Sequence, residues 1–106
     1  MITESTDAAE LTAFFRKVFP AESEKVIAWR YRRAIHLVWK RHDEIAGHMG
    51  LKPVVIETPE ASLSAAWIFD WVVPPAHRGQ SGGMKLMKEA RERFPLTMGV
   101  QLTAAS

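Results

Sequence analysis

The stretch VVPPAHRGQSGGMKLMKEA, residues 72–90, constrains the fold of this chain more than any other. An apolar segment runs through two prolines into a glycine-rich turn, and a helical pattern follows, with its buried side formed by Met84, Met87, Ala90 and Phe94. A helix start presents unpaired N–H groups and a positive dipole end, and glycines let a bulky anion approach the backbone. The stretch therefore predicts a strand, a tight turn and a helix, with a phosphate site at the turn.

Two helices are expected before the first strand. Asp7 and Glu10 resemble a capping box, and one apolar helical face follows them, formed by Leu11, Phe14, Phe15 and Val18. Pro20 should end this helix, and residues 22–32 indicate a second one. The chain therefore begins with a helical region.

The first two strands form a predicted hairpin. From Arg33, apolar and polar residues alternate up to Lys40, as in a half-buried strand, and the polar run at 41–44 suits a turn. Residues 45–56 form the expected returning strand. Its Gly47 and Gly50 predict a bulge or a close backbone approach, and Pro53 should bend or end its regular part.

A loop at 58–64 leads to a third strand at 65–73, and a last strand is expected at 96–102. Alternation places Trp67, Phe69 and Trp71 on one face of the third strand and Ile68, Asp70 and Val72 on the other. The first three strands should form an antiparallel meander, followed by a parallel, right-handed strand–helix–strand unit. The predicted fold class is α+β with a mixed sheet, in a single domain covering residues 1–106.

The composition excludes several classes of function. The chain has no cysteine, so it holds no disulfide, thiolate metal site or cysteine nucleophile. Its net charge is only +2, and this excess of basic residues is too small for an obligate polyanion binder. The N-terminus lacks the basic and apolar regions of a signal peptide, and no apolar run is long enough to span a membrane. We expect a soluble, cytoplasmic protein.

Two familiar phosphate loops do not fit the turn. A Walker loop that started at Gly79 would need glycine where Met84 stands, and no register gives the Gly-x-Gly-x-x-Gly of a dinucleotide turn. A third pattern fits better. Val73, Pro75, His77, Arg78, Gly79 and Gly83 match positions of the acyl-CoA-binding motif of the GCN5-related N-acetyltransferases (GNAT), which this segment resembles. The order of the elements also resembles that family's fold.

Two positions depart from the family motif. Ser81 stands where the middle glycine is usual, and Gly82 stands where a branched apolar residue is usual. We expect Ser81 to donate its backbone N–H and its hydroxyl to cap the helix. The competing interpretation is that the turn is only a tight connection that needs glycine for its dihedral angles.

The resemblance implies acetyl-CoA as cosubstrate, no metal, and an amine acceptor that attacks the thioester directly. The cosubstrate would lie in a splay between the strands at 65–73 and 96–102. Backbone groups of Trp71, Val72 and Val73 would pair with pantetheine, and Arg78 would add a charge-assisted contact. The pyrophosphate would be bound by the N–H groups of Gly79, Gln80, Ser81, Gly82, Gly83 and Met84.

The resemblance also implies a base and an acid. Asp70, just before the splay, is the candidate base, with a water as intermediary; alternatively it is an ordinary polar residue or a hydrogen-bond anchor. The family's acid is a tyrosine on a helix beyond the fifth strand, whereas this chain ends at Ser106 and its one tyrosine is Tyr31. The family's first strand has almost no room in residues 1–6.

The C-terminal part of the family fold is therefore expected to be missing. A natural short member, a truncated product and a chain completed by a second copy all fit. An unpaired strand edge near Val100 motivates a homodimer.

Other residues carry weaker hypotheses. His36 and His48 lie on neighbouring predicted strands and could face one another, but surface or packed histidines are expected rather than a metal site. His77 is expected to be structural, and the four tryptophans to be core, with Trp71 also a candidate for the cofactor cleft. The basic run at 29–33 could touch an acidic acceptor or nucleic acid, although a solvated helix end is the preferred interpretation.

Three functions are weighed. The first is an acyl-CoA-dependent N-acetyltransferase, and the second is a CoA-binding or regulatory module of the same fold that has lost catalysis. The third is a small domain that binds nucleic acid, which the near-neutral charge disfavours.

Overall fold

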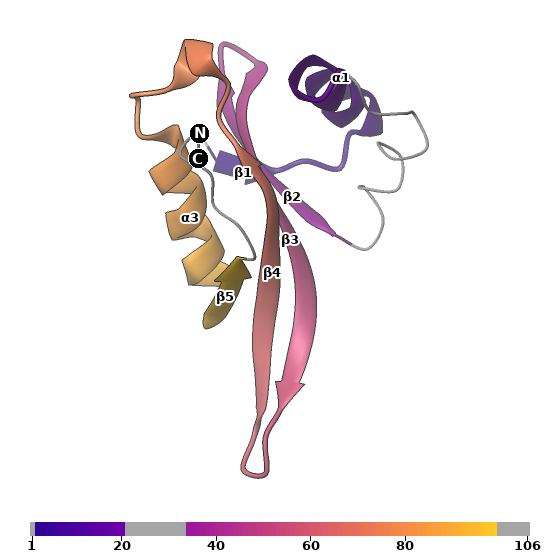
Figure 1. The fold of residues 1–106 in the computed structure, drawn as a ribbon, viewed down its shortest axis with the longest axis vertical. Coiled ribbons are helices and arrows are strands. Elements are labelled where there is room, and N and C mark those ends of the chain that lie inside the picture. The colour runs from indigo at the N-terminus through magenta and orange to yellow at the C-terminus, as the bar shows by residue number, and fades with distance from the viewer. Residues whose placement is uncertain (1, 21–33, 100–106) are drawn as a thin grey trace.

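In the part of the chain that the structure describes, a mixed five-stranded sheet has a helix on each face (Figure 1). The computed structural model describes residues 2–20 and 34–99. Its strands are β1 (Ile2–Glu4), β2 (Ile35–Arg41), β3 (Glu44–Glu57), β4 (Ser62–Val72) and β5 (Leu96–Gly99), and its helices are α1 (Ala8–Val18), the short 3₁₀ helix η1 (Pro75–His77) and α3 (Gly82–Arg93). The predicted mixed sheet, antiparallel meander and parallel β4–α3–β5 unit are confirmed. The helix expected at 22–32 lies outside the described residues.

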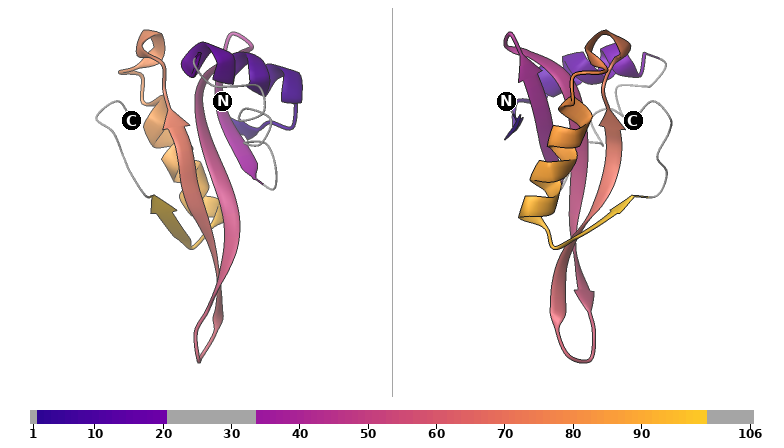
Figure 2. Two further views of the ribbon diagram at one scale, coloured as in Figure 1. Left: turned by 45° about the vertical axis from the view of Figure 1, so that its right-hand side comes forward. Right: turned by 90° about the vertical axis from the view of Figure 1, so that its left-hand side faces the viewer.

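The strands follow one another in the sheet in the order β1-β2-β3-β4-β5, and only β4 and β5 run parallel. Helices α1 and α3 cover opposite faces, as the two views of Figure 2 show. Strand β2 was predicted to be half-buried, but His36 and Val38 are buried as well as Leu37 and Trp39. The prediction was wrong because both faces of this strand lie under a helix.

Each face of the sheet has its own core. On the face of α1, Leu11, Phe14 and Phe15 pack with Val38, and we call this the α1-side core. The α3-side core consists of Leu37, Trp39, Ala46, Met49, Leu51, Ala66, Ile68, Val73, Leu86 and Ala90. The apolar periodicity of α1 identified the side that it buries. For α3 the prediction was only partly right, because Ala90 is buried but Met84 is 69% exposed, and the buried Leu86 was not among the predicted residues.

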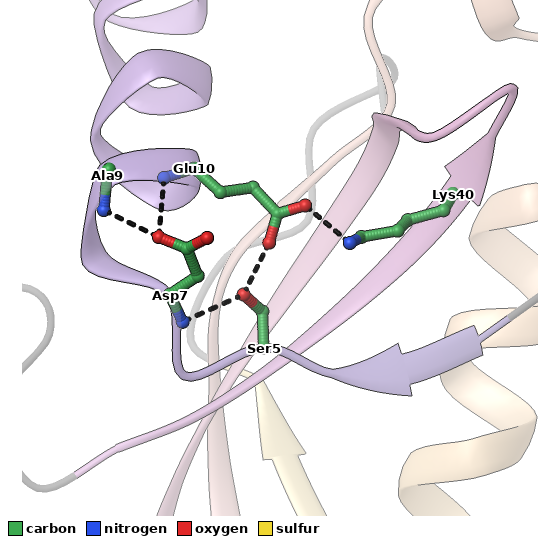
Figure 3. A network of polar contacts seen from close by, with 5 residues as sticks. All are labelled: Ser5, Asp7, Ala9, Glu10 and Lys40. Carbon is green, nitrogen blue, oxygen red and sulfur yellow. Dashed lines mark hydrogen bonds and ion pairs between the residues drawn. The ribbon is translucent and has the colours of Figure 1, made fainter.

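A polar network fixes the start of α1 (Figure 3). Asp7 is the N-cap, and its Oδ1 accepts from the N–H groups of Ala9 at 3.0 Å and Glu10 at 3.2 Å. Glu10 does not complete the box through the N–H of Asp7. Its carboxylate accepts from the Ser5 hydroxyl and pairs with Lys40 on β2, while Ser5 accepts from the N–H of Asp7. The pair ties α1 to the sheet, and the hydrogen bond that Lys40 donates to Glu10 raises the pKa of Lys40.

The expected lack of room for a first strand was wrong. Residues Ile2–Glu4 form β1, which pairs with β2 from Ile2 opposite Trp39 to Glu4 opposite Leu37. Three residues suffice because the edge of β2 supplies the partners. Arg93 on α3 also pairs with Glu4 at 2.9 Å, and its bonds to Glu89 and Glu4 raise its pKa.

Strand β3 continues through Pro53, which was expected to bend or end it. Pro53 pairs with Ala66 of β4, whereas β2 begins only opposite Leu51. Proline is tolerated at such an edge position, where no ladder bond to a second neighbour is lost. The pairing of β4 with β5 reaches only to Ala65, opposite Val54, so beyond Val54 the β3–β4 hairpin extends away from the rest of the fold as a two-stranded arm (Figure 1). Among the described helices, none is long and apolar enough to cross a membrane.

Candidate functional site

The end of β4 extends past its parallel partner. Parallel pairing begins with Ala65 opposite Leu96 and ends with Ile68 opposite Gly99, whereas β4 itself continues to Val72. Within the residues that the structure describes, Phe69–Val72 therefore has no strand on its β5 side. An extended ligand that adds to a sheet as a further strand would lie along a segment of this kind.

A bulge interrupts β4 in this same segment. His48 pairs with Val72 and Gly50 pairs with Phe69, so β4 holds one more residue than β3 between these two pairs. Asp70 has a φ of 47°, in the left-handed region. An extra residue of this kind bends a strand and redirects the side chains that follow it.

The bulge overturns the predicted faces of β4. Trp71 was expected beside Trp67 and Phe69, but it packs against the α3-side core, while Val72 packs against the α1-side core. Strict alternation failed because it assumes a ladder without an extra residue. Gly50 shows the predicted close approach: a Cβ there would lie 2.3 Å from Cζ of Phe69.

The connection from β4 to α3 is held by its own hydrogen bonds. Pro75–His77 forms a single 3₁₀ turn, in which the N–H of His77 donates to the carbonyl of Pro74. Nε of Arg78 donates to the carbonyl of Val73 at 2.9 Å. Arg78 is exposed, and no described carboxylate pairs with it. His77 packs edge-on against Trp39, as a structural residue would.

The turn presents a run of backbone N–H groups. Gly79 has a φ of 84°, and a Cβ there would meet nothing within 4 Å. The first bond of the helix ladder goes from the N–H of Lys85 to the carbonyl of Ser81. The N–H groups of Gly82, Gly83 and Met84 precede that ladder and lie at the positive end of the helix dipole. This geometry suits an anion.

Ser81 does not cap α3 through its side chain. It is the N-cap residue, but its φ of 65° and ψ of 12° are left-handed, and its side chain makes no capping bond. Capping hydroxyls act from the extended region, so the expected cap was wrong. The left-handed conformation favours glycine, which gives a physical reason for the glycine that the family motif has here.

Gly82 serves packing rather than ligand approach. The residue is buried under the indole of Trp39, where a Cβ would lie 2.0 Å from Cε3. This contact seats the first turn of α3 on β2. Trp39 thus occupies the space that a branched side chain would take in the family motif. The glycines of the turn therefore have different roles, since Gly82 serves helix packing.

The sequence did not reveal a hydrogen-bonded histidine pair behind the bulge. His36 and His48 are both buried, and Nδ1 of His36 lies 2.9 Å from Nε2 of His48. Nδ1 of His48 lies 2.8 Å from the carbonyl oxygen of Asp70. The two rings face one another, and of the two expected alternatives, surface or packed, their burial confirms packing. Within residues 2–20 and 34–99, no three histidine, aspartate or glutamate side chains gather as metal ligands.

The structure thus brings most of the predicted site residues to one end of the sheet. Trp71, Val72 and Val73 lie at the open end of β4, and residues 78–84 form the turn that follows. Asp70 lies at the bulge of β4, directly before Trp71. Tyr31 and the basic run at 29–33 lie outside the described residues. The same holds for residues 100–102 of the predicted last strand.

A family model matches nearly the whole chain. The model, described as an acetyltransferase (GNAT) domain, matches residues 2–102. A comparison with curated proteins finds no match.

Solved structures share the fold at low sequence identity. A candidate acetyltransferase from Agrobacterium tumefaciens strain C58 is 16% identical, with a TM-score of 0.75 over 98% of this chain and 83% of the other. An acetyltransferase from Trypanosoma brucei is 17% identical, with a TM-score of 0.67 over 96% and 82% of the two chains. A soil metagenomic aminoglycoside acetyltransferase, solved with sisomicin, is 17% identical, with a TM-score of 0.71 over 97% and 78%.

Proposed function

Because the chain belongs to the acetyltransferase (GNAT) family, we propose that it binds acetyl-CoA and transfers the acetyl group to an amine. The observation that carries this proposal is the combination of the open end of β4 with the N–H-rich turn that follows it. The first suits an extended arm and the second suits a pyrophosphate. We propose that residues 1–106 form one domain with this activity.

Two groups of residues would hold acetyl-CoA. The N–H groups of residues 79–84 would bind the pyrophosphate at the helix start, and Arg78 would add a charged contact. Backbone groups of Trp71, Val72 and Val73 would pair with pantetheine as an added strand does. The open space above Gly79 fits a bulky anion at this turn.

The transfer would be a direct substitution. The amine nitrogen forms a bond to the acetyl carbon, the C–S bond breaks, and its electron pair leaves with the thiolate of CoA. One proton of the amine must pass to a base, and we assign this role to Asp70, acting through a water. The acid that protonates the thiolate is not assigned to a residue.

A catalytically impaired CoA-binding module is the second candidate. Ser81 in the motif favours it. Calorimetric titration of acetyl-CoA, followed by thiol release with a panel of amines, separates the two. The panel should include peptides, lysine and an aminoglycoside, since one structural neighbour was solved with sisomicin. Binding without turnover supports the second candidate, and no binding contradicts both.

A substitution at Gly83 tests the placement of the pyrophosphate. A valine there should obstruct the approach of the anion and abolish binding, while Lys88→Val, exposed on the same helix, should bind like the parent. If Gly83→Val folds and binds acetyl-CoA with the affinity of the parent, the placement is wrong.

We also propose a homodimer. In the described part of the chain β5 is an edge strand, and such edges invite pairing with a second copy. Light scattering after size-exclusion chromatography at micromolar concentration tests this, and a monomer would contradict it. A cytoplasmic location stays a prediction.

A further inference from the structure

The buried histidine pair ends on the bulge of β4. His48 on β3 reaches the carbonyl oxygen of Asp70 with Nδ1 at 2.8 Å, and His36 on β2 reaches Nε2 of His48 with Nδ1 at 2.9 Å. One hydrogen-bonded line therefore runs across three neighbouring strands and stops at the residue with the left-handed φ of 47°. We call the hydrogen-bonded series His36, His48 and the carbonyl group of Asp70 the histidine line.

Elementary hydrogen-bond chemistry fixes the protons on this line. A carbonyl oxygen only accepts, so Nδ1 of His48 must carry a hydrogen. In a neutral His48, Nε2 then has no hydrogen and accepts, so Nδ1 of His36 must donate to it. The geometry thus requires the Nδ1–H form of both neutral rings.

The histidine line holds its position and does not transport a proton. A backbone carbonyl cannot accept a proton and pass it on at ordinary pH, so the line ends at Asp70. Its rings are enclosed by aromatic side chains: Phe15 lies edge-on to His48 with centroids 4.8 Å apart, and Phe69 contacts both histidines. This packing fixes the orientation of the rings.

The bulge needs such support. An extra residue in a strand leaves the regular ladder, and a left-handed φ at an aspartate costs free energy that the surroundings must offset. His48 supplies a donor to the carbonyl at this point. The peptide that contains this carbonyl also contains the N–H of Trp71, so its orientation sets the path of the next residues.

We propose that His48, oriented by His36, is a positioning residue that sets the backbone of Trp71 and Val72 for the acyl-pantetheine arm. This rests on the proposed function, because the arm is that of acetyl-CoA. Neither histidine touches the ligand in this arrangement. Their effect passes through one carbonyl group at the bulge.

The protons of the line can be observed without any ligand. Long-range ¹H–¹⁵N correlation spectra of the parent protein distinguish the two neutral forms of a histidine ring. We expect Nδ1–H in both His36 and His48 near neutral pH. A neutral His48 with its hydrogen on Nε2 would overturn the proposal, whatever the protein binds.

Three substitutions at one position separate the hydrogen bond from packing. The amide nitrogen of His48→Asn takes the place of Nδ1, whereas His48→Gln places its amide near Nε2 and His48→Leu keeps bulk without a donor. We expect acetyl-CoA to bind to the Leu and Gln variants about tenfold more weakly, as for one lost hydrogen bond, and to the Asn variant within about threefold of the parent.

A shortened ligand gives the matched control. 3′-Phosphoadenosine 5′-diphosphate has the nucleotide and pyrophosphate of CoA without pantetheine, so it tests the turn at 79–84 alone. Its affinity should be the same in all four proteins. Equal losses for both ligands, or a Leu variant that binds acetyl-CoA like the parent, would overturn the positioning role. A parent that binds neither ligand would instead overturn the proposed function, and with it the role of the line at that site.

Discussion

The indole of Trp39 lies so close over Gly82 that any side chain at position 82 would collide with it. A Cβ at Gly82 would come within 2.0 Å of Cε3 and 2.2 Å of Cζ3. Trp39 is buried on β2, and Gly82 is the first residue of α3. This contact therefore sets where the helix, and with it the N–H-rich turn, lies on the sheet.

Gly82→Ala should destabilise the fold by roughly 1–3 kcal/mol, because one methyl group overpacks a rigid aromatic contact. Chemical denaturation of the parent and the variant measures the loss. Trp39→Leu with Gly82→Ala should recover part of it, since the two substitutions relieve the same collision. Unchanged stability in Gly82→Ala would show that α3 shifts freely on the sheet.

Ser81→Gly should stabilise the protein by about 0.5–1 kcal/mol, because glycine adopts the left-handed conformation without the cost that serine bears. Ser81→Ala should stay within about 0.5 kcal/mol of the parent, since the hydroxyl makes no capping bond. Thermal and chemical unfolding measure both variants. A loss near 1 kcal/mol in Ser81→Ala would mean that the hydroxyl caps the helix in solution.

Asp70→Asn tests the candidate base without removing the bulge, because asparagine also tolerates a left-handed φ. We expect acetyl transfer to fall about 10²-fold or more while the affinity for acetyl-CoA stays the same. The rate is measured with the acceptor that the amine panel identifies. An Asn variant with the activity of the parent would show that Asp70 is only an anchor of the strand.

The pair of Lys40 with Glu10 should contribute to stability only while the lysine is charged. The hydrogen bond to Glu10 raises the pKa of Lys40 above its ordinary value of 10.5. Its contribution is therefore complete below about pH 10 and is lost as the pH rises through the raised pKa. The difference in melting temperature between the parent and Lys40→Met should be constant from about pH 7 to 9.5 and shrink above that range.

Lys52→Met is the matched control for that titration, because Lys52 is an exposed lysine on β3 and belongs to no ion pair that the structure describes. Its difference from the parent should not follow the same course. A Lys40→Met difference that is independent of pH up to the alkaline limit of folding would contradict a role for the charge.

Local patterns were enough to predict the strand–turn–helix at residues 72–90 and the mixed sheet. The helical period placed Ala90 correctly on the buried side of α3 but wrongly included Met84, which is exposed, and Gly50 indicated a close approach that Phe69 makes. These features depend on residues that are close in sequence, or on a glycine whose presence alone indicates a close backbone approach.

Other features depend on partners that the chain brings together only when folded. Trp71 lies on the face opposite to the predicted one, because β4 has one residue more than β3 between the partners of His48 and Gly50. Alternation along a single strand does not reveal such a bulge. Pro53 stayed in a strand because β2 does not extend beside it. The roles of the nitrogens in His36 and His48 follow from ring geometry, and a spacing of twelve residues does not specify it.

Because of the two-stranded arm, the free energy of local opening differs along the sheet and is lowest in the arm. Between Val54 and the hairpin turn at residues 58–61, β3 and β4 have no neighbour but each other in the described chain, and isolated ribbons of two strands are marginally stable. Amide hydrogens should therefore exchange with solvent fastest near the tip of the arm and progressively more slowly toward Leu51. The bulge at Asp70 lies at the slow end of this gradient, so fraying of the arm can occur without disturbing the segment that faces the proposed ligand.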